Sequence, residues 1–331
     1  VAWKIEPGRE PSVSKVVIGP AGSGISNGHG IGFGDVNGDG RPDISCAAKG
    51  GDAFPDGEWF AWWEQPKDPT QAWEKHLLAV NQPGATNIMP ADLDGDGHTD
   101  YFATRGHGQG VLWFKGPKFV QIEIDPEIIF PHSLDLGDLD NDGDLDAVTS
   151  SKDPVDVTAW YENNGKGKFT RRVIAAKQGS YDTRAIDMDG DGDIALLYSD
   201  RRGVSQGVGW LENPGSATIR KPTAWKDHLL GGQGKEVMFL DAADLDGDDD
   251  TDIVCTTRSQ QLLIFKKADT KWDVDSLPNP YGLPHGKAVA IGDVNGDGRP
   301  DLVHTTNTGG NRKVPGVSWL EQAESKWAVH N

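Results

Sequence analysis

Six short acidic loops recur along this chain, and their side chains have the type and spacing of calcium ligands. They begin at residues 35, 92, 138, 187, 244 and 293, and each places Asp or Asn at loop positions one, three and five. Glycine stands at position six of five loops, and Asp stands at position nine of five. Oxygen ligands at this spacing wrap one Ca²⁺, while glycine makes the sharp turn. We therefore predict up to six structural calcium sites.

The expected side-chain ligands come from positions one, three, five and nine, and position seven is expected to offer its backbone carbonyl. The side-chain ligands are Asp35, Asn37, Asp39 and Asp43; Asp92, Asp94, Asp96 and Asp100; Asp138, Asp140, Asp142 and Asp146; Asp187, Asp189 and Asp191; Asp244, Asp246, Asp248 and Asp252; and Asp293, Asn295, Asp297 and Asp301. The carbonyls belong to Arg41, His98, Asp144, Asp193, Asp250 and Arg299.

Two loops depart from the shared pattern. The fourth has Ala195 at position nine, so we expect weak binding there unless Asp193 moves in. The fifth has Asp249 where the others have the turn glycine. Asp tolerates a left-handed backbone better than most residues. None of the loops carries the Glu at position twelve of helix–loop–helix calcium sites, and apolar β-forming residues flank them. We expect each loop to join two strands of a hairpin.

The elements that position these loops follow one four-strand pattern. In the first copy, an apolar segment (30–33) leads into the loop, and a second apolar segment (43–47) leaves it. An aromatic segment (62–65, WWEQ) and a fourth segment (73–77, WEKHL) follow. Short strands, regular turns and 43 glycines indicate an all-β chain.

The pattern recurs about every fifty residues, which indicates a β-propeller of four-stranded blades. One such sheet cannot bury both of its faces alone, but a ring of them can. We predict a single domain over residues 1–331 with six blades; seven, with a degenerate blade built from the two termini, is the alternative.

These residues resemble the FG-GAP/VCBS repeat family. The loop motif carries the resemblance, together with the segment WYENNGKGKFTRRVI at residues 160–174. It covers nearly the whole chain and implies a propeller with calcium in the loop after the innermost strand. The family includes integrin α-chains, fungal lectins and propeller polysaccharide lyases, so the resemblance implies a fold much more than a function.

Composition excludes several classes of partner. The formal charge is −19, but the loops hold 25 of the 51 acidic residues, and the other 26 are outnumbered by 32 Lys and Arg. No basic helix or run indicates nucleic acid. No stretch approaches 18 apolar residues, so we expect no membrane span. Cys46 and Cys255 occupy equivalent positions in distant repeats, so we expect two buried thiols. Weak calcium loops suit extracellular calcium, so we expect a secreted protein, and we expect a monomer.

The face opposite the calcium loops is expected to carry the chemistry. The starts of first strands and the ends of second strands should meet there, at the central mouth of the ring. Basic, imidazole, amide and phenol groups precede the first strands: His29, Asn87, His132, Tyr181, Arg184, His285 and Lys287. Others follow the second strands: Lys49, Arg105, His107, Arg201 and Arg258. The mouth is therefore predicted to be basic.

A basic mouth suits an acidic oligo- or polysaccharide, because guanidinium groups pair with carboxylates. We predict a lyase that cleaves a uronic-acid glycan by β-elimination, as the resemblance to propeller lyases also implies. His29 and His132 are the candidate base and acid, Tyr181 is an alternative base, and Arg184 and Arg105 are candidate carboxylate clamps. The remaining mouth residues would bind substrate.

Two other functions remain open at this point. A lectin would repeat one pocket between blades, whereas the mouth residues here differ from blade to blade. A zinc-dependent sugar dehydratase would use His29, His132 and His285, since three imidazoles suit Zn²⁺. Singly, each mouth residue could have a structural role instead. We expect that role for His76, His228 and His330, which recur in the fourth strands.

Overall fold

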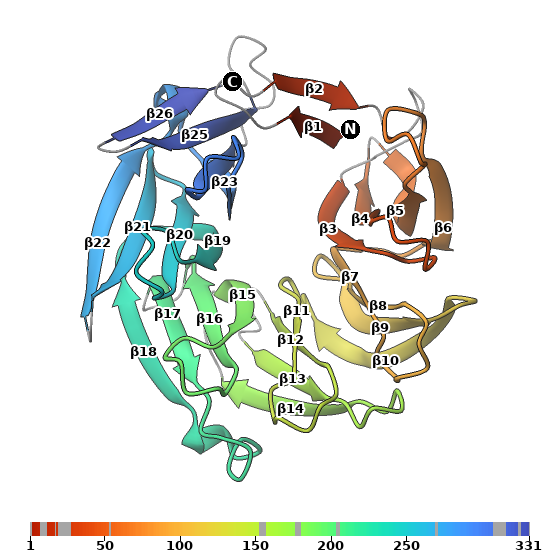
Figure 1. Ribbon diagram of the computed structural model, residues 1–331. Helices are drawn as coiled ribbons and strands as arrows, with labels where there is room; N and C mark the ends of the chain where they lie inside the picture. The colour runs from red at the N-terminus through yellow and green to blue at the C-terminus, as the bar shows by residue number, and fades with distance from the viewer. Residues whose placement is uncertain are drawn as a thin grey trace. The chain divides into compact units, whose positions relative to one another are not determined.

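The chain forms antiparallel β-sheets, with two one-turn 3₁₀ helices (Pro222–Ala224 and Pro280–Gly282) as the only helices in the part described. The computed structural model describes residues 2–6, 12–16, 18, 28–52, 54–151, 157–175, 180–202, 206–268, 271–306, 316–323 and 326–330. Six sheets have four strands each, in which every strand pairs with its neighbour along the chain (Figure 1). The all-β class and the six blades are confirmed.

The strands fall into two compact units. The first unit holds three whole blades: β3 (Gly28–Gly34), β4 (Asp43–Gly51), β5 (Phe54–Glu64) and β6 (Glu74–Val80); β7 (Asn87–Ala91), β8 (Asp100–Thr104), β9 (Gln109–Lys115) and β10 (Val120–Ile129); β11 (Asp135–Gly137), β12 (Asp146–Ser150), β13 (Thr158–Glu162) and β14 (Thr170–Ala175).

The second unit holds two whole blades: β19 (Val237–Ala243), β20 (Asp252–Thr257), β21 (Gln261–Ala268) and β22 (Lys271–Pro278); β23 (Gly286–Gly292), β24 (Asp301–Thr306), β25 (Val317–Ala323) and β26 (Lys326–His330). The fourth blade comprises β15 (Ser180–Ile186), β16 (Ala195–Asp200), β17 (Gly207–Glu212) and β18 (Lys226–Gly231). At the N-terminus, β1 (Ala2–Glu6) pairs with β2 (Ser12–Val16) in a separate two-stranded sheet.

Each acidic loop joins the first and second strands of its blade, as predicted. The Asp at position nine then fixes the loop to the third strand. In the first blade Asp43 accepts hydrogen bonds from the backbone N–H of Val36 (3.0 Å) and of Gln65 (2.8 Å). Asp146 accepts the same pair from Leu139 (3.1 Å) and Asn163 (2.7 Å). Position nine therefore has a structural role that ligand spacing alone does not reveal.

Buried side chains between adjacent sheets form the core. Phe60 of β5 and Phe114 of β9 meet edge to face, with ring centroids 5.5 Å apart, in a cluster shared by the first two blades. Close approach also needs glycine, because a Cβ on Gly30 of β3 would lie 2.4 Å from the carbonyl oxygen of Thr86. Cys46 and Cys255 are buried free thiols, as predicted.

Side chains that follow the third strands tie neighbouring blades together. The Asn163 amide donates to the carbonyl of Leu93 in the loop of the preceding blade (2.7 Å). Asn213 donates to Leu139 in the same way (2.8 Å). The Asn that ends the segments WYEN (160–163) and WLEN (210–213) therefore encodes a contact between blades. Within the described residues, no helix is long and apolar enough to cross a membrane.

Candidate functional site

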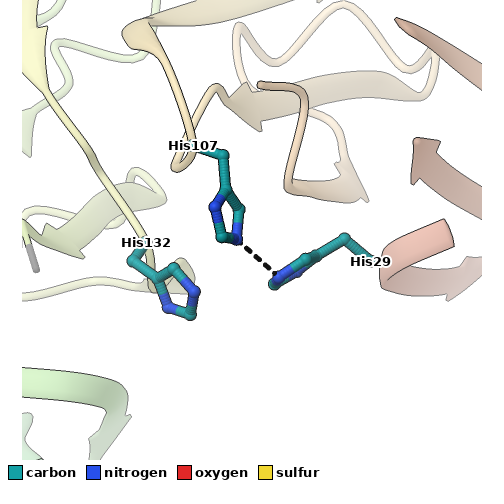
Figure 2. A group of neighbouring side chains, drawn as sticks. All are labelled: His29, His107 and His132. Carbon is teal, nitrogen blue, oxygen red and sulfur yellow. Dashed lines mark hydrogen bonds between the residues drawn. The ribbon is translucent and has the colours of Figure 1, made fainter. Parts of the chain in front are cut away.

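Three histidines from three blades meet in the first unit. His29 lies on β3, His107 in the turn between β8 and β9, and His132 just after β10, before the first strand of the third blade. Figure 2 shows their rings turned toward one another. The ring centroids are 4.9 Å apart for His29 and His107, 5.2 Å for His29 and His132, and 5.3 Å for His107 and His132. One nitrogen of each ring lies within 4.8 Å of the other two.

Glycine lets the turn that carries His107 approach His132. A Cβ on Gly106 would lie 2.6 Å from the carbonyl oxygen of Pro131 and 2.7 Å from Cα of His132. The backbone N–H of His107 donates to the carbonyl of Gly84 (3.1 Å), which holds the other side of the turn. The segment RGHGQG (105–110) is therefore a close-packing motif around one histidine.

Asn87 holds the backbone at His132. Its side-chain amide donates to the carbonyl of His132 (2.7 Å) and to the hydroxyl of Thr104 (3.1 Å). The N–H of His132 donates to the carbonyl of Ser150 (2.9 Å). Asn87 was predicted to bind substrate, and in the structure its amide holds the backbone carbonyl of His132.

The contacts of His132 define its tautomer. Its Nδ1 lies 3.2 Å from the carbonyl oxygen of Tyr181, and because that oxygen can only accept, Nδ1 carries the hydrogen. In the neutral ring Nε2 then holds a lone pair. The Tyr181 ring packs beside it at a centroid distance of 4.3 Å. His132 is 1 % exposed.

The other two imidazoles share one short contact. Nε2 of His107 lies 3.0 Å from Nε2 of His29 (Figure 2). A nitrogen–nitrogen hydrogen bond needs one protonated and one unprotonated partner. Alternatively, both lone pairs could face one cation, since the nitrogens of a tetrahedral zinc site are separated by about 3.3 Å. The cluster can therefore either move a proton or hold a metal.

The predicted arginines do not all face this cluster. The guanidinium of Arg105 is held by Glu123 (2.9 and 3.2 Å) and by Gln82 (2.7 and 3.1 Å). Arg184 lies three residues after Tyr181 on β15. Its Nη2 lies 3.8 Å from Asp182. Lys49 on β4 lies opposite Glu58 on β5 in the register of the sheet.

Four other mouth candidates belong to the second unit. Arg201 and Arg258 both contact Glu236, at 3.3 and 3.4 Å. Nδ1 of His285 lies 3.1 Å from the carbonyl oxygen of Arg258, and Nζ of Lys287 lies 4.7 Å from the centre of the Phe239 ring. The expected trio of His29, His132 and His285 thus draws on both units, whereas His107 lies beside His29 and His132 within the first.

His107 supplies the third imidazole of the trio instead. His285 precedes a first strand, as the other two histidines do, but it lies eight residues before its loop and they lie six before theirs. His107 follows a second strand, and its flanking glycines were the available signal.

The outer-strand histidines have the structural role that was expected. His76 stacks on Trp62, His228 on Trp210 and His330 on Trp319, with ring centroids 4.2, 4.4 and 4.2 Å apart. His330 also contacts Glu321 (2.8 Å).

The acidic loops have a geometry suited to a divalent cation. The carboxylates of Asp92, Asp94 and Asp96 converge within 4.8 Å. Asp92, at loop position one, accepts hydrogen bonds from the backbone N–H groups of Gly95 (2.8 Å) and Gly97 (2.9 Å), and these bonds close the loop. In each loop, a backbone N–H at position four or six donates a hydrogen bond to the Asp carboxylate at position one.

Burial disfavours the charged form of the carboxyl at position nine. It raises the pKa of the Asp146 carboxyl to about 7 and also raises the pKa of the Asp43 and Asp100 carboxyls above their usual range. A nearby cation would favour the ionised forms. These residues therefore fit Ca²⁺.

The two unusual loops fold like the others, with local differences. Asp249 adopts φ +68°, the left-handed turn that glycine makes elsewhere. In the fourth loop, Asp187, Asp189 and Asp191 still converge within 4.8 Å. The carboxylate of Asp193 is bound by the side chain of Asn141 (2.6 Å) from the third loop.

Comparison with known proteins adds one finding about the repeat. A sequence profile of the FG-GAP-like repeat matches residues 92–149, 138–198 and 244–304, which together make up just over half of the chain. No curated protein sequence matches the chain significantly.

Proposed function

Because the chain belongs to the FG-GAP-like repeat family, we propose that its loops bind structural calcium and that its three-histidine cluster is the site of a carbon–oxygen lyase acting on an acidic sugar. The observation that carries the second part is the convergence of His29, His107 and His132 from three blades, with Tyr181 beside them. A cluster built from single copies of otherwise repeated blades has no need to exist for the fold alone.

The reaction would be a β-elimination. A base removes the proton on the carbon next to the sugar's carboxylate, and the electron pair of that C–H bond forms a carbon–carbon double bond. The bond from the neighbouring carbon to the leaving oxygen breaks, and an acid gives that oxygen a proton. The products are a 4,5-unsaturated uronate and a free hydroxyl end. The site must therefore supply one base, one acid and a positive charge near the carboxylate.

The imidazoles can supply the proton transfers. Across the 3.0 Å contact between His29 and His107, one ring holds a proton that the other lacks. The Nε2 lone pair of His132 is fixed by the bond from Nδ1–H to Tyr181, which makes this ring a base in its neutral form. Tyr181 is the second candidate base. Arg184 stays the candidate carboxylate clamp, since Arg105 is already engaged by Glu123.

A second candidate function rests on the same geometry. Three ring nitrogens within 4.8 Å of one another suit Zn²⁺, which is bound by three imidazoles in many catalytic sites. Zinc would polarise a carbonyl or carboxylate of the substrate. The protein would then be a metal-dependent dehydratase of a keto-sugar, with Tyr181 as the residue left to move the proton.

The test is the absorbance near 235 nm, where an unsaturated uronate absorbs, with the protein incubated in calcium against a panel of uronate glycans. The zinc content of the purified protein is measured in parallel by mass spectrometry. We expect a rise with the natural protein and at least a hundredfold loss of rate in His29→Ala, His107→Ala and His132→Ala. His228→Ala is the matched control, because that ring stacks on Trp210 in an outer strand.

The outcomes separate the candidates. Absorbance that rises without bound zinc supports acid–base elimination by the imidazoles. Bound zinc that His107→Ala removes, with turnover of keto-sugars and none of uronates, supports the dehydratase. Glycan binding on an array without any turnover would reject both enzymes and leave a lectin. The proposal includes an extracellular location, where millimolar calcium would fill weak loops.

A further inference from the structure

In the third acidic loop, an arginine from the next blade contacts one of the carboxylates. Asp140, at loop position three, has a side chain only 2 % exposed. Nη2 of Arg220 lies 2.5 Å from Oδ2 of Asp140 and 2.5 Å from Oε1 of Glu162. Nε of Arg220 donates to the same Glu162 oxygen at 2.8 Å. The guanidinium therefore bridges a loop ligand and the end of β13.

The chain holds Arg220 in place from both sides. It belongs to the connection between β17 and β18, where the N–H of Ile219 donates to the carbonyl of Gly215 (2.9 Å). The Ile219 side chain is 2 % exposed, and the Trp225 indole N–H donates to its carbonyl (3.0 Å). Asn213, at the start of the connection, bonds Leu139 inside the third loop. Arg220 is therefore delivered by an anchored segment of the next blade.

The other loops are balanced differently. The first and sixth loops have Asn37 and Asn295 at position three, so no carboxylate is present at that position. Their arginine comes from position seven of the same loop and contacts position five, Arg41 on Asp39 and Arg299 on Asp297. In the second and fifth loops, Lys115 contacts Asp94 and Lys266 contacts Asp246 (2.9 Å), each from the third strand of the same blade. A lysine is a flexible point charge, whereas an arginine fork fixed on two carboxylates is preorganised.

This arrangement has a direct consequence for calcium. A buried carboxylate needs a compensating charge, and removing one partner of a buried pair leaves an uncompensated charge. Arg220 is that partner for Asp140, and calcium would have to displace it or share the carboxylate with it. We propose that Arg220 is a built-in counter-cation of the third loop, which competes with calcium there and keeps the third and fourth blades joined when calcium is scarce.

The test is calorimetric titration of the chelator-treated protein with CaCl₂ at constant ionic strength. Arg220→Gln removes the charge and is expected to raise the calcium affinity of one site at least tenfold, or to add one site to those observed. Arg172→Gln is the matched control. Arg172 also binds Glu162 (2.7 Å), but within the described residues it is not bonded to a loop carboxylate. An isotherm that Arg220→Gln leaves unchanged, or a loss of affinity, overturns the proposal.

A second variant covers the case in which Arg220→Gln fails to fold. In otherwise natural protein at 1 mM calcium, Asp140→Asn is expected to leave the number of bound ions unchanged. The loss of one ion would contradict competition by Arg220. This inference rests on the proposed calcium loops, but it fails separately: if the natural protein binds no calcium at all, the loop proposal is wrong, whereas calcium binding that ignores Arg220 refutes only the counter-cation.

Discussion

At the scale of single residues, the site is asymmetric although the chain is repetitive. Two of its three histidines depend on particular neighbours: the Asn87 amide donates to the carbonyl of His132, and Gly106 lets the turn of His107 approach His132. Side chains that deviate from the repeat therefore reveal the site better than those that follow it.

The first prediction concerns Asn87 as a positioning residue. Asn87→Ala should lower the zinc affinity of the three-histidine cluster about tenfold, because supporting partners of ligands typically contribute this much. Competition with a zinc-binding dye measures it. Asn87→Asp is the control for side-chain volume, since it keeps the shape but loses the donor to the His132 carbonyl. Equal affinity in all three proteins would show that Asn87 does not position His132.

A buried histidine outside the site should make stability depend on pH. His304 on β24 is fully buried, and within the described part of the chain neither ring nitrogen has a hydrogen-bond partner. Burial lowers its pKa to about 4. Since the unfolded chain takes up the proton near pH 6.5, stability present above that pH is lost as the pH falls toward 4.

His304→Gln should remove this dependence. Between pH 7 and pH 5 the natural protein should lose about 2 kcal/mol of unfolding free energy more than the variant. Urea unfolding in saturating calcium measures the difference. The exposed His98→Gln serves as the control and should keep the natural pH dependence. Parallel pH profiles for His304→Gln and the natural protein would disprove the argument.

At the scale of elements, the repeat motif made the blades predictable. Strand order, loop positions and the structural role of the outer histidines follow from a pattern that occurs six times. What the motif did not reveal is how it is used: Asp146 at position nine also fixes the third strand, and Asn163 reaches a neighbouring blade. Such contacts depend on the distance between sheets, which a one-dimensional spacing does not contain.

The bond from Asn163 to the neighbouring blade should stabilise the array measurably. Its amide donates to the carbonyl of Leu93 at a buried position and to the carbonyl of Leu145 at a partly buried one. Asn163→Ala leaves two acceptors without a donor and should cost about 2–3 kcal/mol of unfolding free energy. Chemical denaturation measures the loss. Lys166→Ala in the same turn is exposed and should be neutral; an equally small effect in Asn163→Ala would refute the tie.

At the scale of the whole molecule, calcium is expected to be a large part of stability. Each loop adds about 1.4 kcal/mol when free calcium is ten times its dissociation constant, because the ion binds only the folded chain. Replacing calcium with chelator should therefore lower the melting temperature by several degrees. Magnesium should restore little, since it demands a smaller octahedral site. A melting temperature that ignores chelator would exclude structural calcium.

The location of the site was partly predictable at this scale. Strand direction placed His29, His107 and His132 on one side of the blades, because each precedes a first strand or follows a second. His107 was predicted to bind substrate and not to join the trio, because it follows a second strand whereas His29 and His132 precede first strands. The ion pair between Arg105 and Glu123 also could not be predicted from the sequence, because the two residues belong to different parts of the blade.

The origin of the three histidines in three successive blades constrains how this gene can change. Tandem repeats readily gain or lose a unit by unequal recombination, and a blade copied or deleted would still find neighbours to pack against. Any such event between residues 29 and 132 would separate His29 from His132 or insert a blade between them, and the cluster would vanish in one step. The length of this stretch is therefore fixed by the site, and so is the distance along the chain to Tyr181, whose ring packs beside His132.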